Sequence, residues 1–257
     1  MEARNNTLNA CLFEKIRAIF LVQGGSVAMR KAANYVAQVL KISLGNEIVP
    51  TIRREAYRAR YGTYIDIGAC QGDTILPVAH LFDQCIAIEP DPRNYKLLQK
   101  NLERISNCLV LNCALGARSE QRILYIEDRT DQSTLTPLGG FGEGGVVFVD
   151  TLDTVVERFH LAPPYLIKID VQGSEYAVLC GAAKVLGNQS TIILEFWPFG
   201  LLNSGTEPAE LLRLMSDFGF LSYNLGLRKV AKDRMAKFVD LGRTKPTIFT
   251  DVVFRKS

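Results

Sequence analysis

The stretch over residues 64–73 constrains the fold of this chain most, because it joins a strand pattern to a glycine-rich turn. It reads Tyr-Ile-Asp-Ile-Gly-Ala-Cys-Gln-Gly-Asp, so apolar alternation leads into Gly68 and Gly72. Glycine allows a backbone to approach a ligand where a Cβ would clash. Asp73 is a suitable N-cap for a helix over residues 74–82. The sequence therefore predicts a buried strand, a turn that can cradle a ligand, and a helix.

This turn lacks the signatures of nucleotide phosphate binding. A dinucleotide turn needs G-x-G-x-x-G, and a P-loop needs Gly-Lys followed by Ser or Thr. Here Asp73 follows the second glycine, and Asp66 ends the strand, where its carboxylate would repel a pyrophosphate. An acidic residue beside the turn suits a ligand that carries positive charge, and an ordinary strand-to-helix turn without a ligand is the alternative.

An acidic residue also ends the next predicted strand. Residues 85–88 are apolar, and Glu89 follows them. In doubly wound sheets a carboxylate at this position accepts hydrogen bonds from the two hydroxyls of a ribose. Asp91 and Pro92 then begin a helix, as N-cap and first helical residue. Glu89 is therefore a candidate ribose ligand.

Two further strands lead to carboxylates. The predicted fourth strand, residues 165–169, is followed by Asp170, and the fifth, residues 191–195, ends with Glu195. Ligands of open α/β sheets bind at the carboxyl ends of the strands. Lys168 lies on the same strand face as Asp170, because side chains two residues apart share a face. An ion pair between them is the structural alternative to a catalytic Asp170. Glu175 lies in the first turn of the next predicted helix, residues 175–187, where it could be only a partner of the helix dipole.

These motifs resemble the FkbM-type methyltransferases. The resemblance rests on Asp66-Ile-Gly-Ala-x-x-Gly72, on Glu89-Pro90 and on the block Ile167-Lys-Ile-Asp-Val-Gln-Gly-Ser-Glu175. It covers roughly residues 60–225. It implies an α/β, Rossmann-like class I methyltransferase fold, with a seven-stranded, mostly parallel sheet and helices on both faces. It also implies S-adenosylmethionine as cofactor and O-methylation of a hydroxyl on a small molecule, sugar or glycan.

The resemblance implies a cofactor site at the ends of the first strands. Its expected members are Asp66, Gly68, Ala69, Gly72, Thr74, Glu89, Pro90, Asn112, Cys113, Ala114 and Asp170. Asn112, Cys113 and Ala114 enter by position alone, because Asn112 ends the predicted third strand, about residues 108–112, and the other two follow it.

Methylation of an alcohol needs a base, and neither of the chain's two histidines lies in a motif. Asp170 is the first candidate for that base, with Glu195 and Lys168 beside it. Asp170 and Glu195 are also hard oxygen ligands that could hold Mg²⁺, although no third ligand is identifiable.

Composition limits the partners and the compartment. A net charge of +3 is too small to indicate nucleic acid or an anionic membrane. Six cysteines without a Cys-x-x-Cys pair indicate a reducing compartment. Neither a secretory signal nor an apolar run long enough for a membrane span is visible. A cytoplasmic protein is therefore predicted.

The predicted organisation has two parts. Residues 1–60 form an N-terminal helical extension or lid, and residues 61–257 form the methyltransferase domain. A β-hairpin with a glycine-rich loop is inserted at about residues 118–150. The arginines of residues 53–60 could belong to a lid that recognises an acidic substrate, but a solvated helix face is favoured.

Two other functions remain open. A dinucleotide-dependent oxidoreductase is disfavoured because G-x-G-x-x-G is missing. A non-catalytic S-adenosylmethionine-binding or scaffold protein of the same fold would keep Gly68, Gly72 and Glu89 but lack a working acceptor site.

Overall fold

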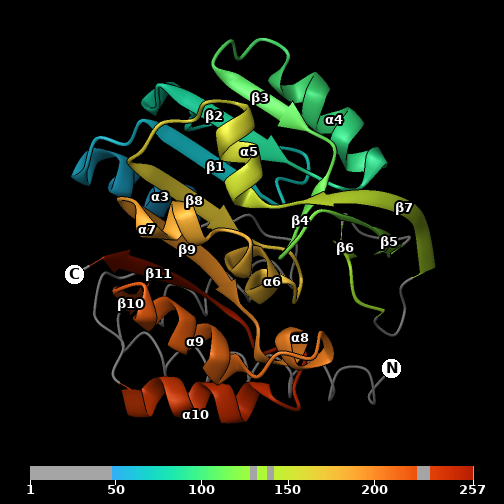
Figure 1. Ribbon diagram of the computed structural model, residues 1–257, viewed down its shortest axis with the longest axis vertical. Helices are drawn as coiled ribbons and strands as arrows, with labels where there is room; N and C mark the ends of the chain where they lie inside the picture. Colours follow the sequence, from blue (N-terminus) through green and yellow to red (C-terminus); the bar gives the residue numbers. More distant parts are fainter. Residues whose placement is uncertain (1–47, 128–131, 138–141, 225–231, 257) are drawn as a thin grey trace, which may run out of the picture.

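The computed structural model describes residues 48–127, 132–137, 142–224 and 232–256 (Figure 1). A seven-stranded sheet lies at its centre, in the order β3-β2-β1-β8-β9-β11-β10. Its strands are β1 (Thr63–Ile67), β2 (Gln84–Ile88), β3 (Cys108–Leu111), β8 (Tyr165–Ile169), β9 (Ser190–Phe196), β10 (Phe220–Asn224) and β11 (Thr250–Lys256). β11 runs antiparallel to both of its neighbours, and the other pairings are parallel. This order confirms the predicted mostly parallel, Rossmann-like sheet.

The central strands are apolar because both of their faces are covered. Every residue of β1 and β8 is buried, as is typical of parallel strands between helical layers. β1 pairs in register with β8, so Asp66 lies directly beside Lys168. Register thus brings together two charged residues that are far apart in the sequence.

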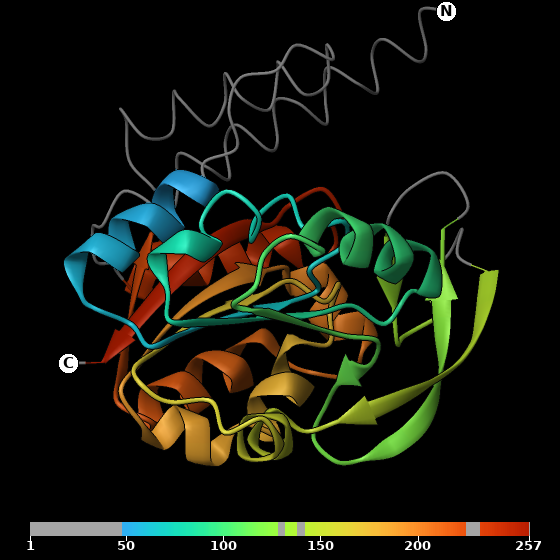
Figure 2. The same ribbon diagram turned by 90° about the horizontal axis from the view of Figure 1, so that it is seen from above.

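Helices cover both faces of this sheet (Figure 2). α3 (Ile48–Arg58) and α4 (Pro92–Leu102) share one core cluster with residues of β1. The other face carries α5 (Leu152–Arg158), α6 (Glu175–Cys180), α7 (Ala183–Gly187), α8 (Pro198–Asn203), α9 (Pro208–Asp217) and α10 (Lys232–Gly242). α4 begins as predicted, with Asp91 accepting a hydrogen bond from the amide of Arg93 and with Pro92 at the first position.

The helix predicted over residues 74–82 is wrong. These residues form turns and a short 3-10 helix, η1 (Ala79–Leu81). Pro77 has no N–H to donate, and the amide of Val78 bonds to the carbonyl of Ile75, three residues back. The segment therefore tightens into 3-10 geometry instead of continuing as an α-helix.

The helix predicted over residues 175–187 is divided in two. Between α6 and α7 the carbonyl of Gly181 accepts from the amide of Asp153, and the Asp153 carboxylate accepts from the amides of Lys184 and Val185. Asp153 thus satisfies free amides at the beginning of α7, as a capping carboxylate does. A residue of α5 thereby allows a new helix to begin.

A second sheet stands at the carboxyl ends of the parallel strands (Figure 1). It contains β4 (Ala114–Leu115), β5 (Glu120–Ile126), β6 (Ser133–Thr134) and β7 (Gly142–Asp150), in the order β4-β7-β5-β6. β5 and β7 are antiparallel and fall where the sequence predicts a hairpin. Part of the predicted glycine-rich loop, residues 138–141, lies outside the described residues.

The end of α3 is attached near the opposite, amino-terminal edge of the sheet. Glu55 is fully buried and accepts two hydrogen bonds from Arg255 of β11, at 2.9 and 2.7 Å. Tyr61, which follows α3, donates to the hydroxyl of Thr191 at the beginning of β9. This attachment places the end of α3 away from the carboxyl edge. Residues 1–47 of the predicted extension or lid lie outside the described residues, and the domain boundaries stay predictions.

Within the described ranges, no helix is long and apolar enough to span a membrane. The five cysteines described there are free thiols.

Candidate active site

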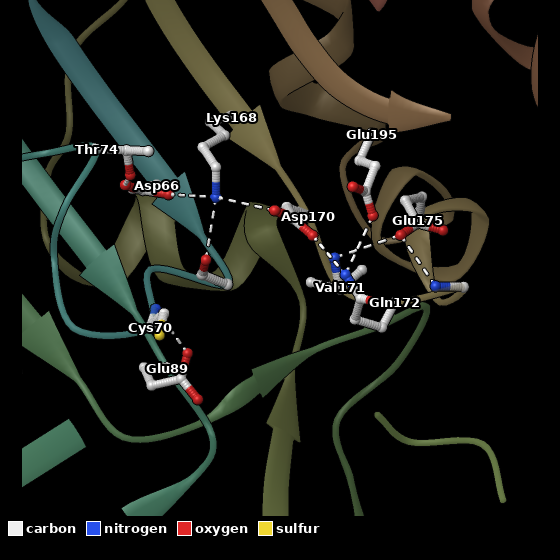
Figure 3. A network of polar contacts seen from close by, with 12 residues as sticks. Asp66, Cys70, Thr74, Glu89, Lys168, Asp170, Val171, Gln172, Glu175 and Glu195 are labelled. Carbon is white, nitrogen blue, oxygen red and sulfur yellow. Dashed lines mark hydrogen bonds and ion pairs between the residues drawn. The ribbon is translucent and has the colours of Figure 1, made fainter. Parts of the chain in front are cut away.

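Lys168 is the buried cation at the carboxyl edge of the sheet (Figure 3). Its Nζ lies 3.1 Å from Oδ1 of Asp66 and donates to the carbonyl of Gly68 at 3.0 Å. Oδ2 of Asp170 is 3.7 Å from the same nitrogen. Burial alone would lower the pKa of Lys168, but Asp66 and Asp170 outweigh it and raise the pKa above its usual value. The lysine is therefore a charged anchor between two strand ends, and the contact with Asp170 is present as the sequence suggested.

Asp66 has no exposed surface. Its Oδ1 faces Lys168, and its Oδ2 accepts a short hydrogen bond from the hydroxyl of Thr74. Both residues were predicted to bind cofactor, and that role stays a prediction. Their side chains contact each other, so they hold the turn after β1 in shape.

Gly68 allows the turn after β1 to pass close to the turn after β8. Its φ is +76°, and a Cβ added there would lie 1.9 Å from the carbonyl oxygen of Asp170. A Cβ on Gly72 would meet the side chain of Leu98 at 3.0 Å. Gly68 is thus required by packing within the chain, and Gly72 is favoured by its φ of +94°, whatever both also permit to a ligand.

Glu89 is 3% exposed at the end of β2. Its Oε2 accepts from the amide of Cys70 and its Oε1 from the amide of Asp91, both at 2.9 Å. Burial raises the pKa of Glu89 to about 7. A carboxylate has about four acceptor positions, so the two amides leave room for a pair of ribose hydroxyls. Glu89 therefore has the free acceptor positions that its predicted role as a ribose ligand requires.

The three residues placed by position alone have different surroundings. Asn112 donates to the carbonyls of Glu89 and Pro90, at 2.8 and 3.1 Å, and so stabilises the turn after β2. Cys113 and Ala114 are buried in two core clusters, which leaves mainly their backbone for a ligand. Ala69, also predicted, is 3% exposed.

Asp170 and Glu195 are brought together through Gln172. The side-chain nitrogen of Gln172 donates to Oδ1 of Asp170 at 2.9 Å and to Oε2 of Glu195 at 3.1 Å (Figure 3). The Asp170 side chain is 35% exposed, unlike the buried Asp66 and Glu89. The sequence placed both carboxylates at one edge but did not single out Gln172, which lies inside the motif block that ends at Glu175.

Glu175 accepts hydrogen bonds from the backbone of the same turn. Its Oε1 accepts from the amides of Gly173 and Val171, at 3.0 and 3.3 Å, while its Oε2 is buried without a hydrogen-bond partner among the described residues. Burial raises the pKa of Glu175 to about 7. The sequence suggested a partner for the helix dipole, and the structure adds a hydrogen-bonding role for the backbone of this turn.

The predicted Mg²⁺ site does not fit the donors that are present. An amide nitrogen, which cannot be a metal ligand while it donates, lies between Asp170 and Glu195. Among the described residues no group of three or more His, Cys, Asp or Glu side chains is arranged to hold a metal ion. We therefore assign no metal to this site.

The sheet order is that of the class I methyltransferase fold. The family model of the methyltransferase FkbM domain matches residues 66–222, which is more than half of the chain. The chain therefore belongs to the FkbM methyltransferase family, whose members depend on S-adenosylmethionine.

Solved structures resemble this fold at low identity. A methyltransferase FkbM from Methylobacillus flagellatus KT is 18% identical over 76% of this chain, with a TM-score of 0.46, and this chain spans 43% of its length. A precorrin-6y C5,15-methyltransferase from Geobacter metallireducens GS-15 is 14% identical over 82% of this chain and 86% of its own, with a TM-score of 0.43. A search of the curated proteins finds no match.

Proposed function

We propose that this chain transfers a methyl group from S-adenosylmethionine to a hydroxyl of a neutral small molecule, sugar or glycan, with Asp170 as the general base. The observation that carries the proposal is the exposure of Asp170. Its carboxylate is 35% exposed at the ligand edge, whereas Asp66, Glu89 and Glu175 are buried and bonded to the chain itself. Of these carboxylates Asp170 is best placed to reach an acceptor.

The cofactor supplies a methyl group on a positively charged sulfur. Glu89 would accept the ribose hydroxyls with the lone pairs that the amides of Cys70 and Asp91 leave, and the turn over residues 68–72 would help to hold the cofactor. The acid-rich edge favours a cation, since like charges repel and opposite charges attract at short range.

The acceptor is expected to be neutral for the same reason. Within the described ranges, the carboxylates of Asp66, Asp170 and Glu195 lie at this edge with the ammonium of Lys168. A phosphorylated or carboxylated acceptor would be repelled, whereas a hydroxyl can donate a hydrogen bond to Asp170.

In the proposed step Asp170 takes the proton of the acceptor hydroxyl as the oxygen bonds to the methyl carbon and the carbon–sulfur bond breaks. Positioning and proton removal are what the protein contributes. Lys168 would hold the orientation of Asp170 from 3.7 Å. A cytoplasmic location stays a prediction from the sequence.

Cofactor binding and transfer are tested separately. Calorimetry with S-adenosylmethionine, and with NAD as control, should give micromolar affinity for the first alone. Transfer is then measured as S-adenosylhomocysteine formed with methyl α-D-glucopyranoside, methyl α-L-rhamnopyranoside and glucose 6-phosphate. We expect turnover with a neutral glycoside and none with the phosphate.

Asp170→Asn should lower kcat about 10²–10⁴-fold while cofactor affinity changes less than threefold. Asp83→Asn is the matched control, because Asp83 is exposed at the opposite edge and pairs loosely with Arg60 at 4.0 Å. Unchanged turnover in Asp170→Asn would remove the base assignment. Cofactor binding without transfer to any glycoside would favour the non-catalytic alternative.

A further inference from the structure

We propose that Thr134 of the second sheet is a positioning residue, which holds Gln172 so that the Gln172 side chain keeps Asp170 and Glu195 together. The proposal rests on the proposed function of Asp170. The arrangement itself can be tested without turnover, so the two ideas can fail independently.

The Gln172 side chain connects two like charges without neutralising either. Its NH₂ group has two N–H donors, one for Asp170 at 2.9 Å and one for Glu195 at 3.1 Å. Two carboxylates this close to one donor repel each other, and a shared neutral donor limits their movement. The cation Lys168 instead bonds to Asp66 and Gly68 and lies farther from Asp170. Gln172 thus orients the proposed base and leaves its negative charge in place.

The backbone of Gln172 needs support to hold this position. Its φ is +52°, a left-handed conformation that residues with a Cβ disfavour. Glu175 accepts from the amides on either side of it, those of Val171 and Gly173. The carbonyl of Gln172 accepts from the hydroxyl of Thr134 at 3.1 Å. The turn is therefore stabilised by hydrogen bonds to Glu175 of α6 and to Thr134 of the second sheet.

The burial and hydrogen bonding of Thr134 orient its hydroxyl for this contact. It is 2% exposed, and its hydroxyl oxygen accepts from the amide of Thr136 at 3.2 Å. That bond engages the oxygen and leaves the hydroxyl hydrogen for the Gln172 carbonyl. Thr134 lies 38 residues before Gln172 in the sequence, so the second sheet supplies a part of the site that the parallel sheet lacks.

The first test observes the Gln172 side chain in the ligand-free protein. In ¹⁵N-glutamine-labelled protein, the NH₂ signal of Gln172 is identified by its loss in Gln172→Met. We expect Thr134→Val to speed its hydrogen exchange about tenfold, the factor that corresponds to the net worth of one hydrogen bond. The exchange rate should stay at the wild-type value in Thr134→Ser, which keeps the hydroxyl, and in Thr136→Val, which keeps the backbone amide. A wild-type exchange rate of the Gln172 NH₂ group in Thr134→Val would overturn the proposal.

The second test asks whether Thr134 acts through Gln172. With methyl α-D-glucopyranoside or methyl α-L-rhamnopyranoside, Thr134→Val should lower kcat about tenfold. The KM for S-adenosylmethionine should stay within twofold, and Thr134→Ser should restore kcat. In the Gln172→Met background, Thr134→Val should have no further effect.

The proposal would be wrong if Thr134→Val and Gln172→Met lowered kcat independently, so that their effects multiply in the double variant. Thr134 would then only anchor the second sheet. If the wild-type protein transfers no methyl group, the proposed function fails, while the exchange measurement still decides the role of Thr134.

Discussion

Replacing Lys168 by methionine should destabilise the fold far more than removing a surface lysine would. The Lys168 side chain is 7% exposed and lies 3.1 Å from the fully buried carboxylate of Asp66. Methionine keeps the unbranched stem but removes the ammonium from Asp66, which still accepts a hydrogen bond from the hydroxyl of Thr74. Breaking a buried ion pair by removing one partner typically costs about 3–5 kcal/mol, a large part of the roughly 5–15 kcal/mol that stabilises a domain.

The loss is the difference in unfolding free energy between wild type and Lys168→Met, measured by urea unfolding. Urea unfolding can be followed by the fluorescence of Trp197, the one tryptophan of the sequence, which is 9% exposed.

Two controls isolate the ion pair. Lys184→Met removes an ammonium that is 74% exposed and 3.2 Å from an exposed Glu157, so it should cost at most about 1 kcal/mol. Asp66→Asn combined with Lys168→Met removes both charges and should cost less than Lys168→Met alone. Equal losses for Lys168→Met and Lys184→Met would refute the reasoning.

Three further predictions concern the same edge. Gly68→Ala should lower the unfolding free energy by more than about 2 kcal/mol, since its Cβ would lie 1.9 Å from the Asp170 carbonyl, whereas Gly142→Ala meets nothing within 4 Å and should stay within about 0.5 kcal/mol in urea unfolding. Burial raises the pKa of Glu175 from 4.5 to about 7, so this group lowers stability by about 3 kcal/mol as the pH rises through that window. Glu175→Gln should flatten the fall in urea-derived stability between pH 5 and 8, and an unchanged slope would contradict this. Burial also raises the pKa of Glu89 to about 7, so calorimetric affinity for adenosine should fall about tenfold from pH 8 to pH 6 and become independent of pH in Glu89→Gln; a flat wild-type profile would count against ribose binding by Glu89.

Prediction from sequence succeeded where a local pattern was sufficient. The strand before Asp170 was predicted over residues 165–169 and is β8 with the same bounds. Apolar runs of this length have few other solutions between two helical layers. The helix over residues 74–82 failed because Pro77 lacks a donor, and the helix over residues 175–187 was divided because Asp153, from another helix, caps its second half.

The residues of the candidate site also fall into those that the sequence predicted and those that it did not. Glu89, Asp170 and Glu195 were found because each follows or ends a recognisable strand. Gln172 and Thr134, the two residues of the proposed positioning contact, were not singled out, although Gln172 lies in the block 167–175 that resembles the FkbM family. Their roles depend on hydrogen bonds that join separate segments, and residue type alone does not indicate such bonds.

The amino-acid sequence by itself determined the strands, the family and the carboxylates that reach the ligand edge, because hydrophobic periodicity and strand ends are local properties. The tertiary structure decided which of those carboxylates are engaged. Parallel register set Asp66 beside Lys168 across 102 residues, and the second sheet brought Thr134 to Gln172. Pairing and burial are properties of the packed chain, and they distinguish the buried Asp66 from the partly exposed Asp170.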